Sequence, residues 1–365
     1  MTKPRNGCSL RQPRSSTIST EIGMTSNKRK VCFTGPTRLT LARDLLRDGK
    51  CELVLGKSND DFPTYRYQRR ELIDLVGDSD VLFPAGREFI GGDILDSCPQ
   101  LQAVVKSSIG IENVDVDAAT ELGILCCNSP TPENYLGVAE ATVGFMVALF
   151  KRLKFNEAFL RRGGWKEPQN RGTLMVGRTV GIIGVGRIGR NVAKRLMPWE
   201  MRVLGYDPYV SQDTVDPLGI KMVALETLLR ESDLVTIHVV LTKETRAMIQ
   251  MRELKMMKRT AYIVNTSRGP VFNEPDLVQA LNEGIIAGAA LDVFAEEPLP
   301  LNSKLREVEP TRLIMTPHII GNNPGSLDAG QRMAAQSILS ILEGKVPDTV
   351  VNPLAIERWK ERFWS

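Results

Sequence analysis

Histidine is the scarcest reactive residue of this chain, with only His238 and His318 among 365 residues. Cysteine is also sparse. The six cysteines all lie in the first 127 residues, form no CxxC pair and show no regular spacing. A chain of this length needs no disulfide staples, so we expect free thiols in a reducing compartment. No metal site is predicted.

Long hydrophobic runs and a true excess of one charge are missing as well. The longest candidate membrane segment, 143–150, has eight residues and runs into Lys151 and Arg152, so it is too short to span a bilayer. The formal net charge of +4 arises at the amino end, because residues 1–30 hold seven Lys and Arg but one acid. The rest of the chain is near −2, which leaves no electrostatic footprint for nucleic acid.

Residues 1–30 are rich in Ser, Thr, Arg and Pro and show no apolar periodicity, which is typical of a disordered basic tail. A transit peptide would have this charge, but no clear amphipathic helix is present, and Met24 could start a shorter product. We expect a cytoplasmic protein, with organellar targeting by the tail as the alternative.

From Val31 onward, short apolar runs alternate with helical patterns, which predicts βαβ units on parallel sheets. The length favours two domains. The first half has apolar runs that begin at 31, 52, 81, 101 and 124. In the second half we predict six strands, at 180–183, 201–206, 234–239, 261–265, 287–293 and 313–315. Two long helices are predicted, one over 133–153 that leaves the first sheet and one over 326–342 that folds back onto it.

The stretch 179–207 has the form of a dinucleotide-binding turn. An apolar run leads into Gly184-Val185-Gly186-Arg187-Ile188-Gly189, and a helix and a second strand ending in Asp207 follow. Gly184 permits the tight turn, Gly186 lets a pyrophosphate approach bare backbone, and Gly189 lets the helix pack on the strand. Asp207 would accept both ribose hydroxyls of NAD and repel the 2′-phosphate of NADP. A chance glycine turn would lack this context.

Three polar side chains follow successive predicted strands of the second half, where open α/β sheets bind ligands. His318 is the better candidate for an acid–base group, because His238 lies inside a strand pattern and is expected to pack beside the cofactor. Arg268 could bind a substrate carboxylate and polarise the neighbouring carbonyl. Glu297 could hydrogen-bond the histidine and hold its proton. Any one of these charges alone would be interpreted as a solvated loop residue.

Over residues 31 to 350, the sequence resembles the D-isomer-specific 2-hydroxyacid dehydrogenase family. The matching blocks are IGIENVDVDAATELGI (109–124), VAEATVG (138–144), GGW (163–165), VGRTVGIIGVGRIG (176–189), SDLVTIHVVLTKETR (232–246), NTSRGPVF (265–272), ALDVFAEEP (290–298) and TPHIIGN (316–322). Their joint order is very specific.

The resemblance implies an NAD-dependent enzyme that interconverts a D-2-hydroxy acid and its 2-keto acid. It implies two doubly wound parallel-sheet α/β domains: a discontinuous flavodoxin-like substrate domain (31–130 and 318–350) and a Rossmann NAD-binding domain (131–317). A homodimer made largely through the second domain and its long first helix is also implied. The catalytic residues would be Arg268, Glu297 and His318, and the substrate would meet Arg268 and the amides of Ser108, Ile109 and Gly110. The cofactor residues would be Gly184, Gly186, Arg187, Ile188, Gly189, Asp207, His238, Thr245 and Asp292.

Departures from the family pattern bear on the substrate. Many members have glycine in place of Ser108 and proline in place of Val240. The phosphoglycerate branch carries a phosphate-binding arginine where this chain has Ala85, with Arg87 two places on, so phosphoglycerate is not favoured. Ile109, where phosphite dehydrogenases have lysine, disfavours that class.

Two further classes share the fold. Formate dehydrogenases have glutamine at the position of the catalytic glutamate, so Glu297 argues against that class. The alternative of another kind is a non-catalytic NAD-sensing scaffold like the C-terminal-binding-protein corepressors, which keep the triad. Such a scaffold needs a peptide-docking cleft in the first domain, for which the sequence gives no clear sign.

Overall fold

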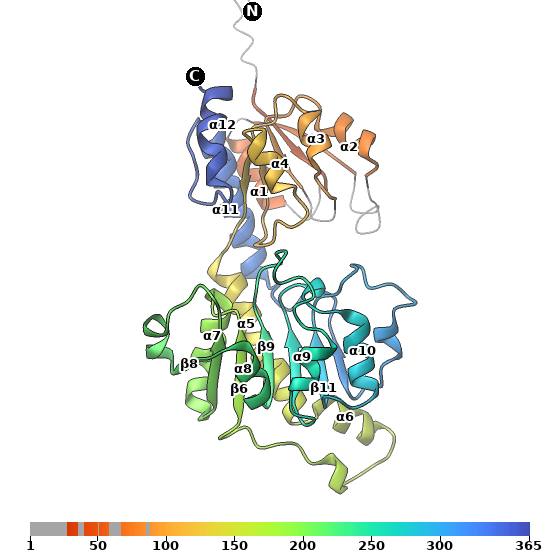
Figure 1. Ribbon diagram of the computed structural model, residues 1–365. Helices are drawn as coiled ribbons and strands as arrows, with labels where there is room; N and C mark the ends of the chain where they lie inside the picture. Colours follow the sequence, from red (N-terminus) through yellow and green to blue (C-terminus); the bar gives the residue numbers. More distant parts are fainter. Residues whose placement is uncertain (1–27, 36–39, 50, 58–66, 85–87) are drawn as a thin grey trace, which may run out of the picture.

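The computed structural model describes residues 28–35, 40–49, 51–57, 67–84 and 88–365. Two parallel sheets lie one above the other, and helices α5 (Pro132–Phe150) and α11 (Pro324–Leu342) stand at the junction between them (Figure 1). The predicted tail, apart from residues 28–30, lies outside the described residues. β1 begins at Lys30, one residue earlier than the first predicted strand.

The first sheet has five parallel strands in the order β2-β1-β3-β4-β5. They are β1 (Lys30–Phe33), β2 (Glu52–Leu55), β3 (Val81–Phe83), β4 (Ala103–Val105) and β5 (Leu125–Cys127). The helices between them are α1 (Thr40–Asp48), α2 (Arg69–Val76), α3 (Gly92–Asp96) and α4 (Val116–Glu121). The order reverses beside β1, as in a flavodoxin-like doubly wound sheet, so this prediction is confirmed.

The second sheet has seven parallel strands in the order β12-β11-β10-β9-β6-β7-β8. They are β6 (Thr179–Ile183), β7 (Arg202–Tyr206), β8 (Ile220–Met222), β9 (Leu234–Ile237), β10 (Tyr262–Asn265), β11 (Gly288–Leu291) and β12 (Leu313–Met315). Its remaining helices are α7 (Arg187–Leu196), α8 (Leu225–Glu231), α9 (Met251–Met256) and α10 (Glu274–Asn282). The order reverses between β6 and β9, as in a dinucleotide-binding fold.

The prediction of six strands in this half is wrong by one. β8 is an edge strand of only three residues, and its central residue, Lys221, is polar and exposed, so the apolar run is too short to reveal a strand. It pairs with β7 from Val203 to Gly205.

The predicted long helix over 133–153 is confirmed as α5, but it ends at Phe150 and not at residue 153. α5 begins with Pro132 at its first turn and ends at Phe150, and α6 (Leu153–Arg161) starts after a break. At the break Arg152 has φ +52°, a left-handed conformation that no α-helix can contain. A left-handed arginine has no signature in the sequence.

The carboxy-terminal part returns to the first sheet, as predicted. Ala334 and Ile338 of α11 pack in one apolar cluster with Val31 and Phe33 of β1. The cluster also takes in the fully buried Trp359 of α12 (Ile356–Phe363), a helix beyond the residues that the sequence assigned to this half.

Among the described residues five cysteines are present and all are free, as expected. That part of the chain holds no group of three or more His, Cys, Asp or Glu able to bind a metal ion. Nor does any helix within it combine the length and apolar character that crossing a membrane requires.

Candidate active site

The glycine turn joins β6 to α7, and each glycine meets a different steric demand. Gly184 has φ +90°, and a Cβ there would lie 2.7 Å from the backbone carbon and oxygen of His238. A Cβ on Gly189 would lie 2.3 Å from the carbonyl oxygen of Gly184, so only glycine lets α7 pack this close to the loop. A Cβ on Gly186 would meet nothing within 4 Å. Gly186 therefore presents bare backbone to open space at the amino end of α7.

Asp207 closes this loop from the end of β7. Its carboxylate accepts the amide of Val185 at 2.9 Å and the amide of Tyr209 at 3.0 Å. The acid is thereby held beside the glycine turn, with lone pairs left for ribose hydroxyls. Arg187 and Ile188 form the first turn of α7, where unpaired amides attract phosphate. The residues present fit an NAD molecule laid across this edge of the sheet.

His238 directly follows β9 and has the environment of a neutral imidazole. Burial lowers its pKa to about 3. Nε2 lies 3.0 Å from the hydroxyl of Thr236 and Nδ1 lies 3.5 Å from that of Thr266. Thr245 lies in the following loop, where its hydroxyl donates to the carbonyl of Val240 at 2.7 Å. His238 is thus a packed histidine beside the cofactor turn and is unsuited to carry a proton near neutral pH.

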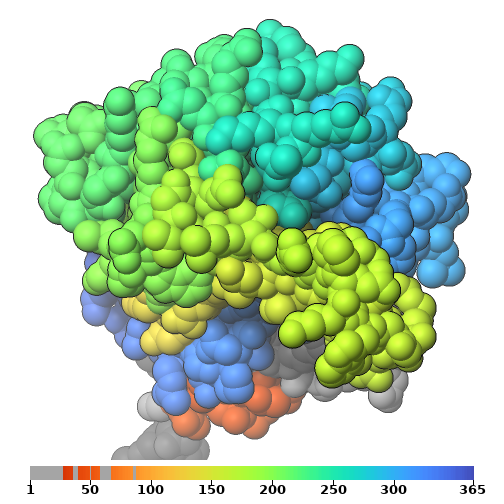
Figure 2. All heavy atoms as spheres, turned by 90° about the horizontal axis from the view of Figure 1, so that it is seen from below, coloured from red at the N-terminus to blue at the C-terminus, as the bar shows by residue number. Residues whose placement is uncertain are grey.

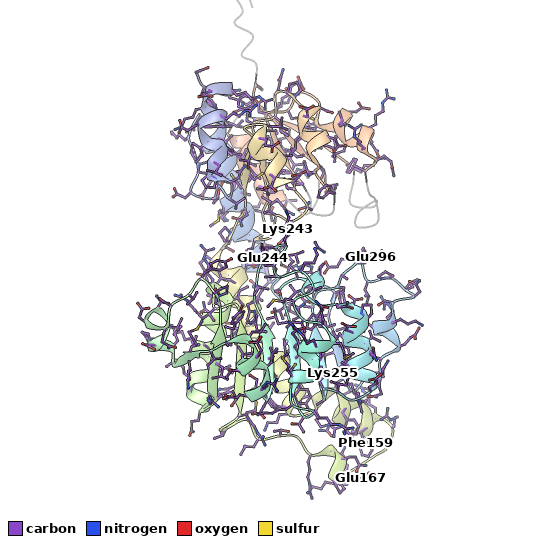
Figure 3. All side chains as sticks on the ribbon, in the orientation of Figure 1. Phe159, Glu167, Lys243, Glu244, Lys255 and Glu296 are labelled. Atoms are coloured by element: carbon purple, nitrogen blue, oxygen red, sulfur yellow. The ribbon has the colours of Figure 1, made fainter. Side chains whose placement is uncertain are left out.

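The loops after β9, β10, β11 and β12 gather at the edge of the seven-stranded half that faces the five-stranded half. Figure 3 shows Lys243, Glu244 and Glu296 at this edge, while Phe159 and Glu167 lie at the opposite end. Figure 2 views the molecule from that opposite end. Since carboxyl ends of parallel strands share one edge, the three predicted catalytic residues come from neighbouring loops.

Arg268 sits on a tight turn after β10 that Asn265 organises. The Asn265 side chain accepts the amide of Ser267 at 2.9 Å and donates to the carbonyl of Arg268 at 2.9 Å. The next residue, Gly269, passes so close to the chain after β11 that a Cβ would lie 1.9 Å from the carbonyl carbon of Phe294. The turn is therefore rigid, and the arginine projects from it toward the other half.

Glu297 and His318 form a direct pair. Nδ1 of His318 lies 2.6 Å from Oε2 of Glu297, and Oε1 of Glu297 accepts the amide of Phe294 at 3.0 Å. Burial favours the neutral acid, but the hydrogen bond and charge of His318, helped by Arg268, hold the pKa of Glu297 below its usual value. The side chain of His318 is 48% exposed and its Nδ1 is engaged, so Nε2 is the ring nitrogen that can face a ligand.

Asp292 fixes the segment that carries this histidine. Its carboxylate accepts the hydroxyl of Thr316, the amide of Ile319 at 3.0 Å and that of Ile320 at 3.4 Å. These bonds bracket His318, which has φ +53°. Burial raises the pKa of Asp292 despite the bonds that oppose it. The structure therefore shows Asp292 holding the histidine loop from beneath.

The predicted substrate loop, Ser108 to Gly110, follows β4 on the opposite side. The Ser108 hydroxyl donates to the carbonyl of Gly110 at 3.1 Å, and the Asn128 side chain donates to the carbonyl of Ile109 at 2.8 Å. A Cβ on Gly110 would lie 2.2 Å from Nη2 of Arg268, so the guanidinium rests directly on this loop. The structure thus brings the substrate loop and the arginine together.

Two charged residues beside the loop were missed by the sequence analysis. Glu112 accepts Nε of Arg268 at 2.7 Å, and the buried Lys106 donates to the side chain of Asn113. Burial lowers the pKa of Lys106 to about 8. Glu112 lies in the block 109–124 that resembles the family, but the spacing of residues in the sequence does not show that it faces Arg268. Ala85 and Arg87 lie outside the described residues.

This geometry combines a nucleotide-binding turn, an arginine beside backbone amides, and a carboxylate–histidine pair at one edge. A family model, the NAD-binding domain of D-isomer specific 2-hydroxyacid dehydrogenases, matches residues 143–319. A glyoxylate reductase from Thermofilum pendens is 38% identical over 311 residues, covering 83% of this chain and 88% of that protein. The chain belongs to the D-isomer specific 2-hydroxyacid dehydrogenase family.

Other members extend the comparison. A D-3-phosphoglycerate dehydrogenase from Methanocaldococcus jannaschii is 33% identical over 324 residues, which cover 88% of this chain and 59% of that protein. The crystal structure of D-lactate dehydrogenase from Aquifex aeolicus, complexed with NAD and lactic acid, superimposes with a TM-score of 0.78 at 25% identity. The superposition covers 89% of this chain and 99% of the D-lactate dehydrogenase chain. The protein is an NAD-dependent D-2-hydroxyacid dehydrogenase, and the fold and cofactor predictions are confirmed.

Proposed function

We propose that this dehydrogenase reduces a short 2-keto acid to the D-2-hydroxy acid with Arg268, Glu297 and His318 as its catalytic residues. The five-stranded half, with residues 31–130 and 318–350, would be the substrate domain, and residues 131–317 the NAD-binding domain. The observation that carries the proposal is the 2.6 Å pair between His318 and Glu297, next to an arginine that rests on the substrate loop.

The chain's own groups suggest how the reaction proceeds. The substrate carboxylate would bind the amides of Ser108, Ile109 and Gly110, and Arg268 would polarise the carbonyl and stabilise the charge that grows on its oxygen. Bound NADH supplies the hydride for the carbonyl carbon. His318 would give the carbonyl oxygen a proton from Nε2, and Glu297 would hold the ring and balance its charge.

The cofactor would lie along Gly184, Gly186, Arg187, Ile188 and Gly189. Asp207 would bind its ribose, and His238 and Thr245 would pack beside it. Asp292 would contact the cofactor as predicted, and it would also hold the loop that carries His318 at the nicotinamide end.

Glyoxylate and hydroxypyruvate are the substrates we favour. The glyoxylate reductase relative has the higher identity, 38% against 33% for the phosphoglycerate enzyme.

The test is NADH oxidation by purified protein against separate 2-keto acids: glyoxylate, hydroxypyruvate, pyruvate, phenylpyruvate, branched 2-keto acids and 3-phosphohydroxypyruvate. We expect turnover on a short acid, and we expect His318→Ala to lower kcat by about a thousandfold while NADH affinity stays unchanged. Glu297→Gln should keep NADH affinity and lose part of kcat. Retained turnover in His318→Ala would refute the acid–base role. If wild-type protein binds NADH but reduces none of the acids, the corepressor-like scaffold becomes the better description.

We further propose a cytoplasmic homodimer. Large apolar side chains are exposed along one segment that lies across the lower face of the NAD-binding half (Figure 2): Leu153, Leu160, Trp165, Leu174 and Val176. Trp165 is 77% exposed, which is costly for an isolated monomer. A second copy covering this segment next to α5 would bury them. The free thiols support a reducing compartment.

A further inference from the structure

The ion pair between Arg268 and Glu112 joins the two halves of the molecule at the reaction site. Arg268 follows β10 of the seven-stranded sheet, and Glu112 lies in the loop between β4 and α4 of the five-stranded half. Nε of Arg268 is 2.7 Å from Oε1 of Glu112, and both side chains are partly shielded, with 26% and 37% exposure. The pair is therefore a direct contact between the two halves that includes a proposed catalytic residue.

The pair also leaves a defined part of the guanidinium available. Nη1 donates to the carbonyl of Ser267 at 2.6 Å, so Nε and Nη1 are both anchored. Nη2 lies over the backbone of Gly110, beside the substrate loop. An arginine side chain has four rotatable bonds and several rotamers. With two of its nitrogens fixed, the third is aimed where a substrate carboxylate and carbonyl would lie.

The electrostatics of Glu112 agree with a permanently charged partner. Burial favours its neutral form, but the charge and hydrogen bond of Arg268 outweigh that effect and hold the pKa of Glu112 below its usual value. Lys106 acts in the same direction. Glu112 is thus ionised at neutral pH, and its bond to Arg268 is charge-assisted and directional.

We infer that Glu112 is a positioning residue, which holds Arg268 in its productive orientation when the two halves close on the substrate. The inference rests on the proposed role of Arg268. Glu112 does not touch the reacting atoms. It acts by removing the alternative orientations of the guanidinium, and a misplacement of about 1 Å in a catalytic group can cost about a hundredfold in rate.

The experiment is a double-mutant cycle in kcat/KM for keto-acid reduction, with Glu112→Ala, Arg268→Ala and the double variant. We expect Glu112→Ala to lower kcat/KM by about ten- to a hundredfold, to raise KM for the keto acid and to leave NADH affinity unchanged. In the Arg268→Ala background, removal of Glu112 should have no further effect, because the group it positions is gone. Glu112→Gln, whose amide oxygen can still accept Nε, should recover most of the loss.

The matched control is Glu231→Ala, because Glu231 pairs with Arg202 at 2.6 Å with similar exposure but remote from the site. It should leave kcat/KM unchanged. An equal loss from Glu112→Ala with and without Arg268 would overturn the positioning role, since the residue would then act through something else. If Arg268→Ala has full activity, the proposed role of Arg268 itself fails. The two failures are therefore distinguishable.

Discussion

Gly186 and Gly189 are three residues apart in one turn, yet alanine at Gly186 should affect cofactor affinity and alanine at Gly189 should affect stability. A Cβ on Gly186 has no neighbour within 4 Å, whereas a Cβ on Gly189 would lie 2.3 Å from a backbone oxygen and 3.0 Å from a methyl group of Ile182. Gly186→Ala should therefore fold normally and lose cofactor affinity. Gly189→Ala should lose stability.

The magnitudes follow from these distances. For Gly189→Ala, α7 must move by about 1 Å away from Gly184, since that oxygen belongs to the backbone and cannot rotate aside. Such overpacking costs about 3 kcal/mol, which for a domain of this size lowers Tm by roughly 10 °C. For Gly186→Ala, an alanine at the helix N-cap position costs less than about 1 kcal/mol. Its methyl group would occupy the space over the amides where a pyrophosphate must come. The loss of one or more charge-assisted bonds would weaken NADH binding about ten- to a hundredfold.

The two assays are differential scanning fluorimetry without cofactor and NADH titration by intrinsic fluorescence. Each variant serves as the other's control. An unchanged Kd for NADH in Gly186→Ala would refute the passage of the pyrophosphate over that residue. An unchanged Tm in Gly189→Ala would refute the close packing of α7 on the loop.

Two further predictions concern other parts of the molecule. The free energy of unfolding should fall as pH drops from 6.5 toward 3, in part because the unfolded chain protonates His238 while burial keeps its pKa in the folded state near 3. In acid-unfolding curves, His238→Asn should reduce the dependence of the unfolding free energy on pH. The same dependence in the variant and the wild type would contradict this prediction. Trp165→Ser should shift the protein from dimer toward monomer in sedimentation velocity. The control is Tyr209→Ser, which should stay dimeric, because Tyr209 is 91% exposed but lies on the distant loop after β7. If Trp165→Ser forms a dimer as stable as that of the wild type, the segment that carries Trp165 is not in the interface.

The sequence predicts the elements with a strong local signal. The apolar strands and the glycine turn are found where the periodicity places them, because buried parallel strands are nearly continuous apolar runs. The short edge strand β8 and the break at Arg152 escaped prediction for a common reason. Both depend on contacts or backbone angles set by tertiary packing, and neither leaves a hydrophobic pattern.

The same distinction applies to the site. Arg268, Glu297 and His318 could be selected from their places after successive strands, and the 2.6 Å contact between the last two agrees with that choice. Glu112 could not be selected, because its partner is 156 residues away and lies on the other sheet. The anchoring by Asp292 was likewise invisible, since two of its three donors are backbone amides that carry no residue identity.

The return of α11 and α12 to the first sheet also determines the order in which the chain can fold. The core around Val31 and Phe33 is completed by Ala334, Ile338 and Trp359, which are synthesised after the whole seven-stranded half. The seven-stranded half is contiguous and can fold while synthesis continues, whereas the five-stranded half cannot complete its core until α12 has been synthesised. Until then its first strands expose the apolar surface that α11 and α12 cover, and such transient exposure favours aggregation during synthesis.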